Sequence, residues 1–201
     1  MSKKIGIFAG TFDPIHAGHL AFARAALAEG LEKVMFLPEP RPRRKQGVRA
    51  LEHRAAMVKL AIADEPRFGQ IVLEQARFTP HETLPVLQAR FAGYRLVLLF
   101  GDDVVAHMAQ WPQVESLVQA AELLIASRYQ HATALKAALR TLQRTTGQSF
   151  EYQIIYPAQE QVASSRLRFK LKRRQPAPEV PPPVQAYIRR HKLYSSETSS
   201  S

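Results

Sequence analysis

Short apolar runs that alternate with segments of helical spacing are the feature of this sequence that most restricts its fold. Runs of this length are typical of buried strands, and the segments between them are long enough for helices. The expected strands cover Ile5 to Phe8, Val34 to Leu37, Ile71 to Leu73, Leu96 to Phe100, Leu123 to Ala126 and Tyr152 to Ile155. The expected helices cover Leu20 to Leu27, Leu51 to Asp64, Leu84 to Phe91, Val114 to Ala121, Ala132 to Thr146 and Val184 to Leu193. This order predicts a Rossmann-like α/β fold, a doubly wound and mostly parallel sheet with helices on both faces.

The 201 residues are enough for one domain of this class with a sizeable core. We expect it to span residues 1–194, with a proline-rich connector at 175–183, a C-terminal helix at 184–193 and a disordered tail at 195–201. The absence of cysteine excludes disulfides, and no apolar stretch approaches the roughly 20 residues that cross a bilayer. No export signal precedes the first strand, so we expect a cytoplasmic protein without a membrane partner. The oligomeric state stays open, a homo-oligomer included.

The stretch from Gly10 to His19 joins the first expected strand to the first helix. Such turns are where open α/β sheets bind ligands, and the N–H groups of a first helical turn suit phosphate. Gly10 lets the backbone approach a ligand, and Gly18 leaves space at the helix start. His16 and His19 are three residues apart, so on one helical turn they share a face and can donate to phosphoryl oxygens.

Two other interpretations of this histidine pair stay open. Two imidazole nitrogens are too few for a metal site, and Asp13 is the nearby candidate for a third ligand. The histidines can also be ordinary surface or core residues, although turns bounded by glycine and proline carry function disproportionately. Phosphate binding is the interpretation that the stretch favours, with no metal site built by the protein itself.

Polar residues also follow the strand from Leu96 to Phe100. Gly101 and Asp103 stand at its carboxyl end, which is the ligand edge of a parallel sheet. Trp111 follows, and its indole face can stack on a flat ring. A helix cap for Asp103 and a core position for Trp111 are the alternatives.

A third polar cluster comes near the end of the chain, where Ser164, Ser165 and Arg168 precede or open a helix. Hydroxyl groups at a helix start can donate to phosphate, and an arginine can contact two phosphate oxygens at once. A plain serine cap with surface arginines is the alternative.

The charge of the chain is strongly basic, with a net value of +11. The excess is concentrated in residues 41–49 and 166–174. Two basic segments far apart in sequence can converge on one polyanionic small molecule. A nucleic-acid-binding surface and ordinary solvated faces are the alternatives, although no recognisable nucleic-acid motif or interleaved aromatic residues support the first.

These motifs resemble those of the nicotinate (or nicotinamide) mononucleotide adenylyltransferases, within the H-x-G-H nucleotidyltransferase superfamily. Residues 10–19 match the form Gly-Thr-Phe-Asp-Pro-x-His-x-Gly-His, and residues 162–168 resemble Ile-Ser-Ser-Thr-x-Ile-Arg. In the second motif Ala163 replaces the first serine and Ser165 the threonine. Gly101, Asp103 and Trp111 match a Gly-x-Asp pattern that is followed by tryptophan.

The resemblance implies an enzyme that joins ATP to a pyridine mononucleotide and releases pyrophosphate, with Mg²⁺ bound mainly through substrate phosphates. It implies a catalytic set of His16, His19, Lys45 and Arg168. It implies an ATP-binding set of Gly10, Thr11, Phe12, His16, Gly18, His19, Gly101, Asp103, Ser164, Ser165 and Arg168. It implies an acceptor-binding set of Thr11, Phe12, Lys45, Arg54, Thr83, Asp103, Trp111 and Arg128. For Arg54 a surface salt bridge is the alternative.

The chain departs from the family pattern in the segment that helps recognise the pyridine end. It keeps Pro80 and Thr83, but His81 and Glu82 stand between them. The acceptor therefore stays open between nicotinate mononucleotide, nicotinamide mononucleotide and another compound. The alternatives in function are a related nucleotidyltransferase, of the phosphopantetheine or cytidylyl-transfer type, and a basic nucleic-acid-binding protein.

Overall fold

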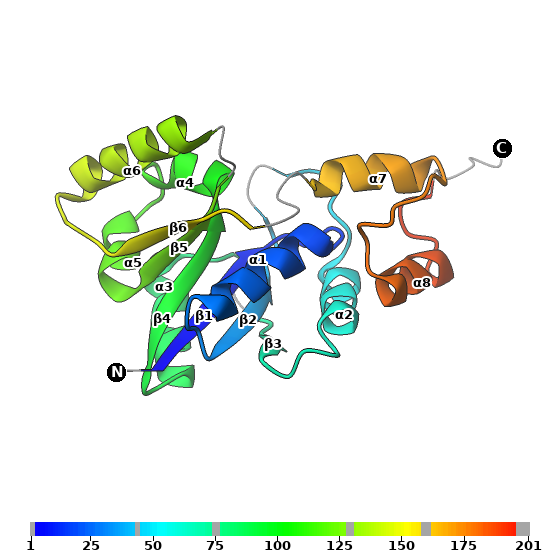
Figure 1. The fold of residues 1–201 in the computed structure, drawn as a ribbon, viewed down its shortest axis with the longest axis horizontal. Helices are drawn as coiled ribbons and strands as arrows, with labels where there is room; N and C mark the ends of the chain where they lie inside the picture. Colours follow the sequence, from blue (N-terminus) through cyan, green and yellow to red (C-terminus); the bar gives the residue numbers. More distant parts are fainter. Residues whose placement is uncertain (1–2, 43–44, 74–76, 128–130, 158–161, 196–201) are drawn as a thin grey trace.

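The computed structural model describes residues 3–42, 45–73, 77–127, 131–157 and 162–195 (Figure 1). Within these residues, six strands form one sheet in the order β3-β2-β1-β4-β5-β6. They are β1 (Lys3–Gly10), β2 (Lys33–Pro38), β3 (Phe68–Gln70), β4 (Tyr94–Gly101), β5 (Glu122–Ala126) and β6 (Tyr152–Ile155). Every pair of neighbouring strands is parallel, which confirms the predicted fold class.

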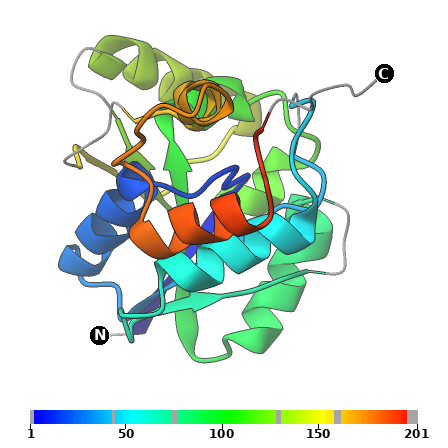
Figure 2. The same ribbon diagram turned by 90° about the vertical axis from the view of Figure 1, so that its right-hand side faces the viewer.

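The helices divide between the two faces of the sheet (Figures 1 and 2). One face carries α1 (Ala17–Ala28), α2 (Leu51–Ala61), α7 (Ser164–Lys172) and α8 (Pro182–Arg190). The other carries α3 (Pro80–Arg90), α4 (Asp102–Met108), α5 (Val114–Ala120) and α6 (Ala132–Thr146). Successive strand residues point to opposite faces, so Leu99 packs in the first layer while Leu98 and Phe100 pack in the second. Burial on both faces explains the unbroken apolar run of β4.

The third strand lies three residues earlier in the chain than the sequence predicted. β3 is Phe68–Gln70, and the expected strand from Ile71 to Leu73 carries no strand assignment. The amide of Ile71 still donates to the carbonyl of Phe36 at 2.8 Å, so the pairing with β2 ends there. Gly69 hid the strand from the pattern, because it has no side chain; a Cβ there would lie 2.5 Å from the Met35 side chain, which fills that space.

Helix ends also differ from the expected ones. α3 begins at Pro80 rather than at Leu84, because the Thr79 amide donates to the Thr83 hydroxyl at 3.0 Å and proline is tolerated in a first turn. α2 ends at Ala61 rather than Asp64.

The C-terminal helix spans 182–190 in place of the expected 184–193, and it packs beside α2 (Figure 2). The part of the expected tail at 196–201 lies outside the described residues. None of the helices in the described ranges is long and apolar enough to span a bilayer.

Candidate functional site

The two central strands part at the carboxyl edge of the sheet. β1 pairs with β2 as far as Gly10, and β4 pairs with β5 as far as Gly101. The pairing between β1 and β4 stops at Ile7 and Leu98, three residues before either strand ends. The strand order also reverses here, and a ligand crevice is expected at such a point in an open α/β sheet. Gly10 and Gly101, both expected from the sequence, therefore stand on opposite sides of this crevice.

His16 and His19 lie together at the start of α1, as their spacing predicted. His16 is the residue just before the helix and His19 is in its first turn, with the rings stacked at a centroid distance of 3.6 Å. The amide of His16 donates to His19 Nδ1 at 3.2 Å. Because Nδ1 accepts this bond, the proton of a neutral His19 ring is on Nε2. His19 thus offers one N–H donor in a fixed direction.

The surroundings keep both imidazoles neutral near pH 7. Burial lowers the pKa of His16 to about 4, and the Glu179 carboxylate offsets part of that effect. Burial also holds the pKa of His19 well below its ordinary value, and the nearby charges of His16 and Lys45 lower it further. Phe8 and Phe12 contribute to this desolvation with ring centroids 5.9 and 5.0 Å from His19.

The backbone amides at this helix start are less available than the sequence suggested. The Ala17 amide donates to the Glu179 carbonyl at 2.7 Å, and the His19 amide donates to the His16 carbonyl at 2.9 Å. Two amides of this first turn are therefore already bonded within the protein, and they are not free for a phosphate.

Phe12 belongs to the core of the loop rather than to its surface. Its side chain is 1% exposed and its φ of 51° is unusual for a residue with a bulky side chain. The ring lies over Gly10, where a Cβ would be 2.8 Å from Phe12 Cζ. Phe12 was expected to contact a ligand. Because its side chain is buried, only its main chain can do so. Gly10 is required because the ring occupies its side-chain position.

Arg54 lies inside the protein and braces three loop segments. Its Nε donates to the Arg49 carbonyl at 2.8 Å, Nη1 to the Thr11 carbonyl at 2.9 Å and Nη2 to the Pro40 carbonyl at 3.0 Å. The side chain is 1% exposed, so the alternative of a surface salt bridge is wrong. A direct contact with an acceptor, expected from the resemblance, is not open to this side chain either. Arg54 instead fixes Thr11, one of the expected ligand residues.

The second motif reaches the first across most of the chain. Arg168 Nη1 donates to the Asp13 carbonyl at 2.7 Å, and the Ser164 hydroxyl donates to the Pro14 carbonyl at 3.2 Å. Ser164 opens α7, with Ala163 in the capping position, so the alternative of a serine cap is wrong. Ser165 is exposed beside it. The two motifs therefore converge in the structure. Ser164 and Arg168 each use one hydrogen-bond donor to contact a main-chain carbonyl of the first loop.

The start of α4 brings Asp103 back over Gly101. A Cβ on Gly101 would lie 2.6 Å from Asp103 Oδ1, so the exposed carboxylate folds back over the glycine. Gly101, not Asp103, is in the capping position, so the alternative of an Asp103 cap is wrong. Trp111 is half-buried, with its ring edge-on to Phe100 at a centroid distance of 5.9 Å. Both expected ligand residues therefore flank the carboxyl end of β4.

The remaining expected site residues differ in their surroundings. Thr83 is fully buried and accepts from the Thr79 amide, so it holds the start of α3 and does not face a ligand. Lys45 is exposed, and it is near enough to His19 to affect the histidine pKa. Arg128 lies outside the described residues.

Sequence reasoning missed a cluster beside this edge. The Asp102 carboxylate accepts from the Ser127 hydroxyl at 3.2 Å and faces His131 Nδ1 at 2.9 Å. Asp102 is adjacent to the expected Asp103, but nothing in the spacing tied it to residues 25 and 29 positions away. Across the described residues, no three histidine, aspartate or glutamate side chains gather closely enough to hold a metal ion.

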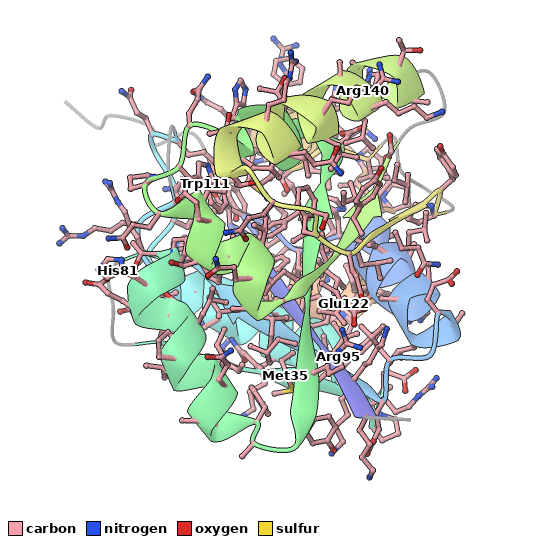
Figure 3. All side chains as sticks on the ribbon, turned by 90° about the vertical axis from the view of Figure 1, so that its left-hand side faces the viewer. Met35, His81, Arg95, Trp111, Glu122 and Arg140 are labelled. Atoms are coloured by element: carbon pink, nitrogen blue, oxygen red, sulfur yellow. The ribbon has the colours of Figure 1, made fainter. Side chains whose placement is uncertain are left out.

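A cavity with a volume of about 690 Å³ lies at the opposite edge of the sheet. It is lined by Arg95 and Glu122, which form an ion pair at 2.9 Å at the amino end of β4. Figure 3 shows this pair well separated from Trp111. The cavity contains none of the expected site residues, so it does not mark the crevice described above.

The profile of the cytidylyltransferase-like family matches residues 7–174, which include both motifs. A "probable nicotinate-nucleotide adenylyltransferase" of Symbiobacterium thermophilum is 39% identical over 95% of each chain. A protein of the same name from Neisseria meningitidis is 35% identical over 96% of this chain and 98% of its own. The two chains resemble this one over nearly their full length.

A solved structure supports the fold. The nicotinic acid mononucleotide adenylyltransferase of Plasmodium falciparum, in complex with NaAD, superposes with a TM-score of 0.76. The match covers 96% of this chain and 97% of that one at 19% sequence identity. At that identity the likeness establishes the shared fold alone.

Proposed function

The chain belongs to the nicotinate-nucleotide adenylyltransferase family within the cytidylyltransferase-like proteins, and on this premise we propose that it transfers the adenylyl group of ATP to nicotinate mononucleotide. The products are the dinucleotide deamido-NAD and pyrophosphate. The observation that carries the proposal is the stacked, neutral histidine pair at the crevice, together with the bonds from Arg168 and Ser164 of the second motif to the loop just before that pair.

The chemistry needs positioning and charge stabilisation more than it needs a base. The 5′-phosphate of the mononucleotide is ionised at neutral pH, so one of its oxygens attacks the α-phosphorus of ATP directly. The bond to the bridging oxygen breaks, and pyrophosphate leaves with the electron pair. Neutral imidazole N–H groups of His16 and His19 donate to the phosphoryl oxygens as charge builds on them. Their low pKa values keep that donor role constant across the neutral range.

The cationic residues hold the triphosphate around this point. Lys45 and the outward part of the Arg168 guanidinium attract the phosphates, and the Ser165 hydroxyl adds a donor at the start of α7. Mg²⁺ would be held mainly through phosphate oxygens and water, and it would neutralise further charge there. The donors around the crevice are imidazole, ammonium, guanidinium and hydroxyl groups, a set that suits phosphate and leaves the metal to the substrate.

Asp103 and Trp111 form the other wall of the crevice, at the end of β4. In the proposal the Asp103 carboxylate accepts from ribose hydroxyls or an amide, and the indole stacks on a flat ring. Arg54 and Thr83, both buried, act through the loops that they hold. Arg128 keeps the acceptor role that the resemblance gives it.

Nicotinate mononucleotide is proposed as the acceptor because relatives at 39% and 35% identity carry that specificity in their names. The segment from Pro80 to Thr83 departs from the usual pattern, so the acceptor needs a direct test. The proposal includes a cytoplasmic location and no stable nucleic-acid or membrane partner.

Pyrophosphate release from ATP, measured with each mononucleotide in turn, tests the activity. We expect release with nicotinate mononucleotide and much less with nicotinamide mononucleotide, phosphopantetheine or CTP in place of ATP. His19→Ala should lower kcat by about a hundredfold or more, because it removes a preorganised donor from the transition state. His107→Ala, at an exposed position of α4, is the matched control and should retain wild-type turnover. Unchanged turnover in His19→Ala would contradict the assigned role.

A further inference from the structure

Tyr194 joins the C-terminal segment to the first loop of the site. Its side chain is 4% exposed, and its hydroxyl donates to Asp13 Oδ1 at 2.5 Å. Asp13 itself is 1% exposed, in the loop between β1 and α1. The contact spans 181 positions of sequence, and it joins Asp13 of the first motif to a tyrosine that lies outside both motifs. The end of the described chain therefore closes onto the phosphate site.

The backbone around Tyr194 is held in an unfavourable shape. Lys192 and Tyr194 have φ values of 50° and 61°, a region that residues with long or bulky side chains rarely adopt. Such conformations persist only where the surrounding structure determines them strongly. The Arg49 guanidinium lies over the Tyr194 ring at 5.2 Å, which adds a cation–π contact to the hydrogen bond. The segment is bent so that this one side chain can enter the protein.

Asp13 faces two partners. The Tyr194 hydroxyl donates a hydrogen bond to Oδ1, whereas Oδ2 is buried without a hydrogen bond from any described residue. Arg168 Nη1 lies 3.9 Å from Oδ2, but it donates to the Asp13 main-chain carbonyl at 2.7 Å instead. A buried carboxylate gains most from a charged donor, so Asp13 and the carbonyl compete for the same guanidinium.

We propose that Tyr194 is a positioning residue that occupies the Asp13 carboxylate and so leaves Arg168 free to bind the triphosphate. This inference rests on the adenylyl transfer proposed above. Without the hydroxyl, Asp13 draws on Arg168, whose Nη1 already lies 3.9 Å from Oδ2, and the guanidinium turns inward to form a direct ion pair. Arg54, which also feels the Asp13 charge, is held by its three bonds to main-chain carbonyls, and Arg49 lies over the Tyr194 ring. Burial and the Asp13 charge raise the pKa of Tyr194, so its hydroxyl stays a donor over the whole working range of pH.

Tyr194→Phe tests the inference because it removes the hydroxyl and keeps the ring. We expect the KM of ATP to rise about tenfold, the effect of losing one charge-assisted contact to phosphate. The KM of nicotinate mononucleotide should stay within about twofold, because Arg168 is assigned to the triphosphate. The matched control is Tyr187→Phe, which removes a hydroxyl that lies 3.0 Å from His53 Nδ1, between α8 and α2. It should leave both KM values unchanged.

Repeating Tyr194→Phe in a variant that lacks the Asp13 charge distinguishes a positioning role of Tyr194 from a general loss of structure. In Asp13→Asn the amide can still accept from Tyr194 but carries no charge to draw Arg168 inward. Adding Tyr194→Phe to that variant should therefore change the affinity for ATP by less than about twofold. Equal rises in both KM values, a KM of ATP unchanged in Tyr194→Phe, or the same loss in both backgrounds would each overturn the inference.

The affinity for a non-hydrolysable ATP analogue, measured by calorimetry on the full chain, gives a reading that does not depend on turnover. It should fall about tenfold in Tyr194→Phe and stay constant in the Tyr187→Phe control. Wild-type protein that binds the analogue but releases no pyrophosphate with any mononucleotide counts against the proposed function. Analogue affinity that is the same in wild type and Tyr194→Phe counts against the positioning role.

Discussion

Arg54→Lys is expected to destabilise the protein by about 3 kcal/mol, although it keeps the positive charge. Three different nitrogens of the arginine donate hydrogen bonds to main-chain carbonyls. The acceptors are the carbonyl oxygens of Arg49, Thr11 and Pro40, at 2.8 to 3.0 Å. A lysine ammonium is a single point at the end of a flexible stem and cannot reach acceptors on three sides of a planar group. Two of the three bonds are lost, and a hydrogen bond to a charged group contributes about 1.5 kcal/mol or more.

Urea unfolding followed by circular dichroism measures the loss, with the slope m expected to stay constant. For a chain of this length 3 kcal/mol corresponds to a fall in Tm of roughly 6 to 12 °C. Arg90→Lys, at the exposed end of α3, is the control and should stay within about 0.5 kcal/mol of wild type. A loss below about 1 kcal/mol in Arg54→Lys would show that the three carbonyls are satisfied in another way, and the bracing role would be wrong.

Two further predictions concern the first loop. The pKa of His16 is about 4 in the folded protein and 6.5 without perturbation, so the unfolded chain binds the extra proton between these values. Stability is then complete above pH 6.5 and falls as the pH drops toward 4, by about 3 kcal/mol, and His16→Gln should flatten this slope in urea titrations. Gly10→Ala would put a Cβ 2.8 Å from the Phe12 ring. We expect a lower Tm and a kcat/KM for ATP reduced by about tenfold, and wild-type values would contradict the assigned packing.

The sequence was sufficient for the parts of the fold that rest on hydrophobic pattern. The unbroken apolar run from Leu96 to Phe100 predicted a strand buried on both faces, and β4 is that strand. The limits of α6 and β6 were also predicted, and Gly147 ends α6 with a φ of 64°. The Gly10–His19 stretch predicted a strand-to-helix turn, which the structure has. These features depend on local spacing, so a single sequence contains them.

Features set by long-range contacts were not predictable. Gly69 gives no β signal, and its place in β3 depends on the Met35 side chain of the neighbouring strand. No sequence pattern marked Arg54 as buried, since its acceptors are carbonyls, which every residue has. Tyr194 followed an expected helix, and no spacing rule links it to Asp13. In each of these cases the contacting group is a main-chain atom or a residue far away in the sequence, and local sequence patterns reveal neither.

The same contacts explain how the loop between β1 and α1 can be rigid although few of its own side chains hold it in place. Arg54 of α2 holds the carbonyl of Thr11, while Arg168 and Ser164 of α7 hold those of Asp13 and Pro14, so three of the four carbonyls from Thr11 to Pro14 are pinned from two separate helices. The two helices lie far apart in the sequence, so the loop reaches its shape only when both have packed against it. His16 and His19 follow directly, and their donors are therefore set before a nucleotide arrives. Preorganised donors stabilise developing charge without reorganising during the reaction, which is what a transfer that lacks a strong base requires.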